Sequence, residues 1–331
     1  MENTLLQRGA RIILKDWMNV RAGEALLIIT DTLHWREMQV LEKCALEDGA
    51  RVLTHLVPWE NTQNLQDHFH ELSALARDHQ VIIGATHYSL VTTELIKRAV
   101  DDGSRFLSLP MATNDGRSLL AYDFLTMDTD KSRFMAKLLL KYINNATHLQ
   151  VNTNAGANFS FRKVGRRGSY FNGRAKDNKG FASSSFEVYV PIEEDQTFGS
   201  GVVNGSLGYL GKVHHDFNIR MEAGKLVEIQ ENEDGIRLKK YMESFHDERI
   251  YHAGEFGIGL NTMAQCEGNC YIEDESSYGT FHIGFGRNIA LGGDFEANGH
   301  FDIVFREPSI YADNRQLVDK GVIIVPEPQA W

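Results

Sequence analysis

Cysteine is scarce in this sequence, with three residues in 331. An odd and small number of cysteines does not make a disulfide framework, which favours a reducing compartment, so we expect a cytoplasmic protein. Cys266 and Cys270 form a C-x3-C pair. A structural zinc site needs a second pair or histidines at matching spacing, so an ordinary loop is the favoured interpretation.

Long apolar segments and an excess of basic residues are absent as well. No run reaches the roughly 18 apolar residues of a membrane span, and the N-terminal sequence MENTLLQRGARIILKDW mixes charges among its apolar residues, unlike a signal peptide. The net charge of -11 argues against broad electrostatic binding to nucleic acid or to anionic membranes. The basic stretch RKVGRRG at 162–168 is best explained as a solvent-exposed hairpin turn. We expect neither a nucleic-acid nor a membrane partner.

The N-terminal part of the chain alternates strand and helix patterns. Hydrophobic residues make up 42% of the sequence, and a chain of this length is expected to form about two domains. Short aliphatic runs predict strands, and two segments with helical periodicity end in glycine. This order predicts βαβ units in a Rossmann-like α/β domain with a mainly parallel sheet. No G-x-G-x-x-G follows the first strand, so a dinucleotide site is not supported. The predicted strands are 25–30, 51–57, 81–86 and 105–109, the helices are 35–49 and 92–103, and 132–147 is a connecting helix.

The pattern changes after about residue 145. Short strands separated by turn glycines follow one another, with one helical segment at 235–245. We therefore predict an α/β N-terminal domain over 1–145 and a β-rich α+β domain over 146–331 that carries the functional site.

Residues that can bind metals lie on the strands of this second part. Side chains alternate between the two faces of a strand, so His300 and Asp302 point the same way. His282 shares its face with Gly284 and Gly286, and Glu255 shares its face with Gly257 and Gly259. Glycine inside a strand often marks the close approach of a ligand. The opposite faces are apolar, at Ile283 and Phe285 on one strand and at Phe256, Ile258 and Leu260 on the other.

Each of these residues has a simpler explanation when taken alone. Glu255, and Glu187 in SSSFEVYVP, are then solvent-facing carboxylates, and His282 is a hydrogen-bonded core histidine. An imidazole and a carboxylate on one strand face, however, are costly to bury unless they are paired or bind a metal. Taken together the residues favour a metal site. Its predicted ligands are Glu187, Glu255, His282, His300 and Asp302. Their formal charge of about -3 suits two divalent ions, and mixed nitrogen and oxygen ligands permit zinc, cobalt, manganese or iron.

The same segments carry a resemblance to a known family. GEALLIITD, GSRFLSLPM, SSSFEVYVP, AGEFGIGLN, EDESSYGTFHIGFGRN and HFDIVF resemble the metallo-aminopeptidases that include aminopeptidase T and aminopeptidase S. The resemblance implies that the five residues hold two metal ions, with Glu255 between them as the most sensitive residue. It also implies a homodimer and a small peptide or small-molecule substrate, whose amide is cleaved by metal-activated hydroxide.

One position departs from that family. The aminopeptidases place a catalytic tyrosine seven residues after the histidine of the HI-G motif, and this position is Ile289 here. Isoleucine cannot donate a hydrogen bond to a developing oxyanion. Tyr278 lies four residues before His282 and shares its face if the strand extends that far, so it is a candidate substitute; the alternative is a packed aromatic residue at the rim.

Two other functions stay open beside the predicted aminopeptidase-like hydrolase. The sequence resembles, more distantly, the 2,5-dihydroxypyridine ring-cleaving dioxygenases, whose iron is held by two histidines and an aspartate. This resemblance implies Fe(II) at His300 and Asp302, with His282 or His252 as the third ligand. His252 ranks lower, because it lies on the strand face opposite Glu255. The other alternative is a catalytically silent relative that binds metal or peptide.

Overall fold

The computed structural model describes residues 2–58, 68–91, 93–175 and 180–325. The chain forms two compact units. The first unit comprises Met1–Thr129 and Phe171–Ser185, and the second comprises Asp130–Tyr170 and Phe186–Trp331.

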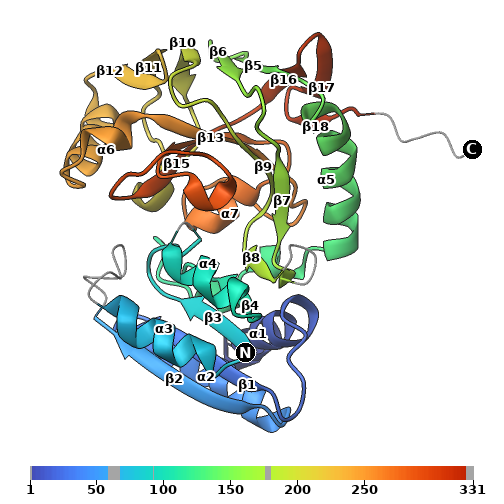
Figure 1. Cartoon of the computed structure of the whole chain (residues 1–331). Coiled ribbons are helices and arrows are strands. Elements are labelled where there is room, and N and C mark those ends of the chain that lie inside the picture. Colours follow the sequence, from blue (N-terminus) through green and yellow to red (C-terminus); the bar gives the residue numbers. More distant parts are fainter. Residues whose placement is uncertain (1, 59–67, 92, 176–179, 326–331) are drawn as a thin grey trace, which may run out of the picture. The chain divides into compact units, whose positions relative to one another are not determined.

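The first unit is built on a five-stranded parallel sheet with the strand order β2-β1-β3-β4-β8 (Figure 1). Strands β1 and β3 are buried along their whole length, which explains their continuous aliphatic sequences. Helices α3 and α4 share one apolar cluster with Leu27, Ile29 and Ile82 of the sheet. The predicted α/β class with a parallel sheet is confirmed. The strands are β1 (Ala25–Asp31), β2 (Arg51–Val57), β3 (Val81–Ala85), β4 (Arg105–Ser108) and β8 (Phe181–Ser183), and the helices are α1 (Glu2–Arg11), α2 (Trp35–Glu47), α3 (Phe69–Arg77) and α4 (Glu94–Asp101).

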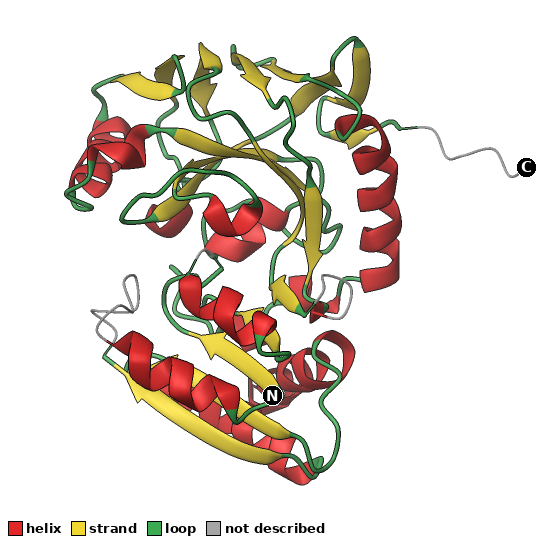
Figure 2. Ribbon diagram, viewed as in Figure 1, coloured by secondary structure: helices red, strands yellow, loops and turns green. Residues whose placement is uncertain are grey.

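The second unit contains two sheets. An eight-stranded sheet has the order β12-β11-β10-β6-β5-β16-β17-β18, and a five-stranded sheet has the order β15-β14-β13-β9-β7 (Figure 2). Its strands are β5 (His148–Thr153), β6 (Asn158–Arg162), β7 (Ser169–Asn172), β9 (Phe186–Pro191), β10 (Thr197–Val203), β11 (Phe217–Glu222), β12 (Lys225–Ile229), β13 (Ala253–Gly259), β14 (Phe281–Gly286), β15 (His300–Phe305), β16 (Pro308–Ala312), β17 (Arg315–Asp319) and β18 (Val322–Ile323). Its helices are α5 (Thr129–Ile143), α6 (Glu233–Glu243) and α7 (Tyr271–Ser276).

Aromatic residues join the two sheets of this unit into one core. Phe161 of β6 meets Phe256 of β13 edge to face, with ring centroids 5.2 Å apart. Ile283 and Phe305 are buried in the same cluster. The apolar faces predicted for β13 and β14 therefore form the core, which leaves the opposite faces of these strands for the polar residues.

The boundary between the units differs from the predicted division at 145/146 in two places. Helix α5 belongs to the second unit, because Ala136, Leu139 and Ile143 are buried in its core. The segment Phe171–Ser185 returns to the first unit, where β8 pairs with β4 at the edge of the parallel sheet. Such a return makes no periodic pattern in the sequence, because it depends on pairing between distant segments.

The basic stretch at 162–168 forms a turn, with Gly165 at a φ of 75°. The prediction of a solvent-exposed turn is wrong for Lys163, which is buried. Its ammonium donates hydrogen bonds to the carbonyl oxygens of Ile143, at 3.0 Å, and Ala146, at 3.1 Å. Lys163 therefore binds the carbonyl groups at the C-terminal end of α5.

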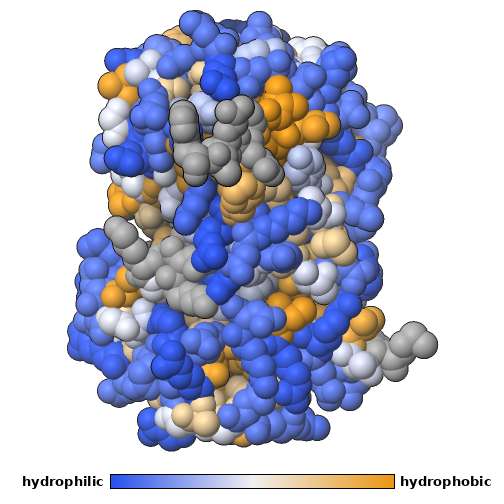
Figure 3. Space-filling model, turned by 90° about the vertical axis from the view of Figure 1, so that its right-hand side faces the viewer, coloured by the Kyte–Doolittle hydropathy of each residue, from blue (hydrophilic) through white to orange (hydrophobic). Residues whose placement is uncertain are grey.

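The molecular surface is polar on the face shown in Figure 3, where apolar residues form small separate groups. Among the described residues, every helix is too short or too polar to cross a bilayer.

Candidate metal centre

The structure brings together the five predicted ligands. They lie on four neighbouring strands of the five-stranded sheet, namely β9, β13, β14 and β15. Their ligand atoms form two groups, and within each group these atoms lie within 4.8 Å of one another. The Glu187 group consists of Glu187, Glu255 and His282, and the Asp302 group consists of Glu255, His300 and Asp302. Glu255 therefore joins the two groups into one cluster.

A glycine lies across the strand ladder from every one of these five residues. The pairs are Gly259 with Glu187, Gly257 with His282, Gly284 with both Glu255 and Asp302, and Gly286 with His300. Directly paired residues point to the same face of a sheet, so a glycine leaves its neighbour's side chain room to lean inward. A Cβ atom at Gly284 would lie 2.8 Å from Oε2 of Glu255 and 2.9 Å from Oδ1 of Asp302. Ligand-type side chains occupy the space beside Gly257 and Gly284. Backbone oxygens of Ser277 and Glu275 occupy it at Gly259, and atoms of Gly299 and Ile250 occupy it at Gly286.

The imidazoles are held in ion pairs with the carboxylates. Nε2 of His282 lies 2.8 Å from Oε2 of Glu187. Nε2 of His300 lies 3.1 Å from Oε2 of Glu255 and 3.5 Å from Oδ1 of Asp302. Nδ1 of His300 lies 2.9 Å from the carbonyl oxygen of Arg287, to which it donates. This bond orients the ring and directs Nε2 into the cluster, as in many metal-binding histidines.

Two residues of α7 complete the cluster and were missed by the sequence analysis. The hydroxyl of Tyr271 donates a hydrogen bond to Oδ2 of Asp302. Glu275 is buried beside Asp302, Glu187 and Glu255. Glu275 lies in EDESSYG, and Tyr271 lies two residues before that segment. Neither residue is on a strand, so the alternation of side chains along a strand could not place them near Asp302. Their place follows only from the packing of α7.

The two histidines of the cluster have raised pKa values, and a bound cation would replace their protons. Burial lowers the pKa of His282 and His300, but the neighbouring carboxylates outweigh it and raise these values to about 9 and about 10. Burial also raises the pKa of Glu255 and, with the charge of Glu187, that of Glu275. Without a metal, protonated imidazoles therefore balance the carboxylates. A divalent ion would supply the same positive charge with the imidazoles neutral.

The donor set fits a metal ion. Among the described residues, Oδ1 of Asp302 has no hydrogen-bond partner although it is buried. Glu255 and Asp302 are 4% and 2% exposed, so water does not solvate their carboxylates. A buried negative charge without a positive partner is costly in free energy. Imidazole nitrogen with carboxylate oxygen suits iron, manganese, cobalt or zinc.

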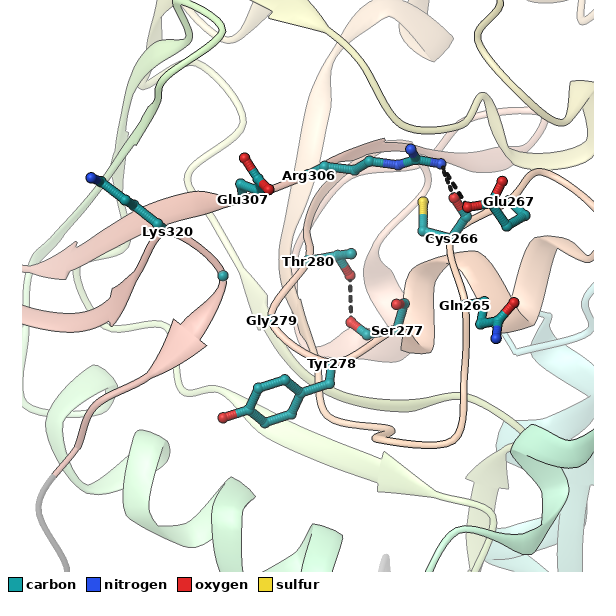
Figure 4. A pocket seen from close by; sticks show the side chains of 11 residues that line it. Gln265, Cys266, Glu267, Ser277, Tyr278, Gly279, Thr280, Arg306, Glu307 and Lys320 are labelled. Atoms are coloured by element: carbon teal, nitrogen blue, oxygen red, sulfur yellow. Dashed lines mark hydrogen bonds and ion pairs between the residues drawn. The ribbon is translucent and has the colours of Figure 1, made fainter.

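Tyr278, the candidate catalytic residue, is not brought to this cluster. Strand β14 begins at Phe281, so Tyr278 lies in the preceding loop. Its hydroxyl accepts a hydrogen bond of 3.2 Å from the N–H of Ile323. It lines an open pocket of about 400 Å³ whose lining includes Thr280, Arg306 and Lys320 but none of the five predicted ligands (Figure 4). Tyr271, by contrast, lies beside the candidate metal ligand Asp302.

Other sequence candidates also lie outside the cluster. Nδ1 of His252 lies 3.2 Å from the carbonyl oxygen of Glu194, and its ring packs against Phe295. Ile289 begins a short 3-10 helix and is 41% exposed. Cys266 and Cys270 are free, buried thiols, and burial raises the pKa of Cys266 to about 12. Within the described chain, neither cysteine belongs to a group that could hold a metal.

Comparison with known proteins decides between the two families that the sequence resembles. The family described as 2,5-dihydroxypyridine 5,6-dioxygenase matches residues 16–325. The chain belongs to this family. A segment of 118 residues is 29% identical to the 2,5-dihydroxypyridine 5,6-dioxygenase of Pseudomonas putida (strain KT2440), and it spans 33% of each chain. The prediction of an aminopeptidase-like hydrolase is therefore wrong, together with its description as a metalloprotease.

Two solved structures share the fold of this chain. The 2,5-dihydroxypyridine dioxygenase from Pseudomonas putida KT2440 superposes with a TM-score of 0.81 at 19% identity, over 99% of both chains. Wild-type AmpT from Thermus thermophilus superposes with a TM-score of 0.68 at 14% identity, over 98% of this chain and 100% of AmpT. Both comparisons establish the fold alone. Because the fold is shared, the strand motifs that it carries do not separate the two activities.

Proposed function

We propose that this protein is a metal-dependent dioxygenase that opens the ring of a dihydroxypyridine or a closely related hydroxylated aromatic substrate. The observation that carries the proposal is the family match over 16–325 in a chain that brings His282, His300 and Asp302 into one cluster, with His282 and Asp302 buried. In such a reaction both atoms of dioxygen enter the product while one bond of the ring breaks.

We assign the metal to His282, His300 and Asp302, with iron as the expected ion. Fe(II) held by two imidazoles and one carboxylate keeps open positions at which dioxygen and substrate can react. His300 and Asp302 come from one group and His282 from the other, and Glu255 lies between them. His252, the other candidate for the third ligand, is turned toward Glu194 and Phe295.

Glu255 and Glu187 are not assigned to the metal in this proposal, and each has another role in the cluster. Glu255 lies against His300, and burial raises the pKa of Glu255. A buried carboxylate with a raised pKa can accept a proton from an aromatic hydroxyl and return it later in the reaction. Glu187 pairs with His282 and holds its ring in place. These carboxylates also favour a cation in the cluster over an uncharged occupant.

Metal content and turnover test the proposal together. Protein purified without chelator or affinity nickel should contain one equivalent of iron, and it should consume dioxygen as the absorbance of 2,5-dihydroxypyridine falls. Asp302→Asn should lose both properties. His252→Ala is the matched control and should keep both.

Two results would overturn this assignment. Two equivalents of zinc, cobalt or manganese with no dioxygen uptake would contradict an iron oxygenase. Bound iron without turnover of any dihydroxypyridine would favour a catalytically silent metal-binding relative.

A further inference from the structure

Helix α7 presents two polar side chains to one metal-ligand candidate. All six of its residues, Tyr271–Ser276, are buried. Residues four apart lie on one face of a helix, so Tyr271 and Glu275 point the same way. The Tyr271 hydroxyl donates to Oδ2 of Asp302, and Glu275 lies beside the same carboxylate. The helix therefore places both side chains against Asp302.

The helix itself is fixed to the strands that carry the other ligands. Oγ of Ser276 accepts a hydrogen bond of 2.9 Å from the N–H of Phe186, the residue before Glu187. The same hydroxyl donates to the carbonyl oxygen of Ile272 at 2.6 Å. Gly259 of β13 leaves space for the backbone oxygen of Ser277. These contacts hold α7 against β9 and β13, so the Tyr271 hydroxyl has a defined position.

The ring of Tyr271 is equally constrained. It lies against the ring of Tyr209, with centroids 4.4 Å apart and an angle of 34° between the planes. Tyr271 is 5% exposed. A buried phenol that is packed on a second ring has few rotamers available, so its hydrogen bond to Asp302 costs little additional side-chain entropy.

We infer that Tyr271 is a positioning residue that makes Asp302 a one-oxygen metal ligand. The donated hydrogen bond occupies Oδ2, whereas Oδ1 faces Nε2 of His300 at 3.5 Å and has no hydrogen-bond partner among the described residues. Oδ1 is therefore the oxygen turned toward the metal. The inference rests on the proposed function only in taking the bound ion as the catalytic metal. Outer hydrogen bonds of this kind change metal affinity by about 10–100-fold.

The test compares Tyr271→Phe with Tyr278→Phe, a matched loss of a tyrosine hydroxyl outside the cluster. Cobalt(II) affinity is measured by competition with a chelator on the full chain. We expect Tyr271→Phe to bind about 10–100-fold more weakly and Tyr278→Phe to bind as the parent does. The visible spectrum of bound cobalt should change in Tyr271→Phe, because Asp302 is then free to use both oxygens. A purely structural role of the hydroxyl would leave this spectrum unchanged.

An Asp302→Asn background gives a second test that does not depend on the stability of one variant. Asp302→Asn is titrated at cobalt concentrations high enough to measure its weakened binding. If Tyr271 acts through Asp302, adding Tyr271→Phe to Asp302→Asn should weaken this residual cobalt binding no further. Equal losses in both backgrounds, or parent-like affinity and spectrum in Tyr271→Phe, would overturn the inference. Cobalt affinity is read without turnover, so failure of the dioxygenase proposal would appear separately, as an absence of dioxygen uptake by the iron-loaded parent.

Discussion

Gly257 lies directly opposite His282 in the β13–β14 ladder, and a methyl group on its Cα would overlap Nε2 of the imidazole. Gly257→Ala should therefore displace the His282 ring from Glu187 while leaving the strand pairing intact. We expect metal affinity to fall at least about tenfold, with a loss of about 1–3 kcal/mol in unfolding free energy from overpacking. Chelator competition and denaturant unfolding measure the two effects.

A strand glycine outside the cluster provides the control for Gly257→Ala. A Cβ at Gly201 of β10 would overlap Ala157 and Phe159 in the eight-stranded sheet. Gly201→Ala should reduce stability but keep the parent metal affinity. Parent-like metal affinity in Gly257→Ala would show that His282 is not a ligand.

Glu255 distinguishes a three-ligand site from a larger one. Glu255→Gln keeps the size of the side chain and removes one negative charge from the residue that joins both groups. With iron held by His282, His300 and Asp302, this variant should retain one equivalent of iron, bound more weakly because the site is less negative. Elemental analysis after dialysis measures the retention.

The matched substitution for this experiment is Glu248→Gln. Glu248 is an exposed carboxylate that pairs with Lys225 at 2.9 Å, and its loss should not affect iron. Complete loss of iron from Glu255→Gln alone would mean that Glu255 is itself a ligand.

Metal binding should release protons at neutral pH. In the metal-free protein the pKa of His282 is about 9 and that of His300 about 10, because their carboxylate partners outweigh burial. Both imidazoles carry a proton at pH 7 and must lose it to bind an ion. Affinity for cobalt should therefore rise between pH 6.5 and 8, by up to about 100-fold per pH unit if both histidines bind the same ion.

Titration calorimetry in two buffers of different ionisation enthalpy counts the released protons.

The raised pKa values of His282 and His300 also make the stability of the metal-free protein depend on pH. Each folded-state pKa lies above the unfolded value of about 6.5, so this contribution is present below pH 6.5 and is lost as the pH rises through 9–10. Cobalt binding with no proton release at pH 7.5 would exclude both histidines as ligands.

Lys163 should contribute to stability through helix α5. Lys163→Met keeps an apolar chain of similar length but leaves the carbonyl groups of Ile143 and Ala146 without their charged donor. We expect a loss of about 1–3 kcal/mol in unfolding free energy, since buried acceptors lose their partner. The exposed Lys239 of α6 offers the control, because Lys239→Met should leave the unfolding midpoint unchanged.

The sequence determined the local elements and the predicted ligands. Runs of aliphatic residues specified β1 and β3 inside the parallel sheet, because a strand buried on both faces must be apolar throughout. Period-two alternation placed Glu187, Glu255, His282 and the H-x-D pair on faces that the structure brings together. It also identified glycines on those faces, although it could not show that each glycine lies opposite a ligand on the neighbouring strand.

Only the tertiary structure decided which other residues join the cluster. Tyr271 and Glu275 reach Asp302 because α7 packs across β9 and β13, and neither strand alternation nor helix periodicity records that contact. Tyr278 was a candidate on the condition that the strand of His282 extended to it, but the strand begins three residues after it. The activity was likewise beyond the strand motifs, because a fold does not specify the reaction of the site that it carries. Local patterns fix which face a side chain occupies, whereas the packing of distant segments decides what lies against it.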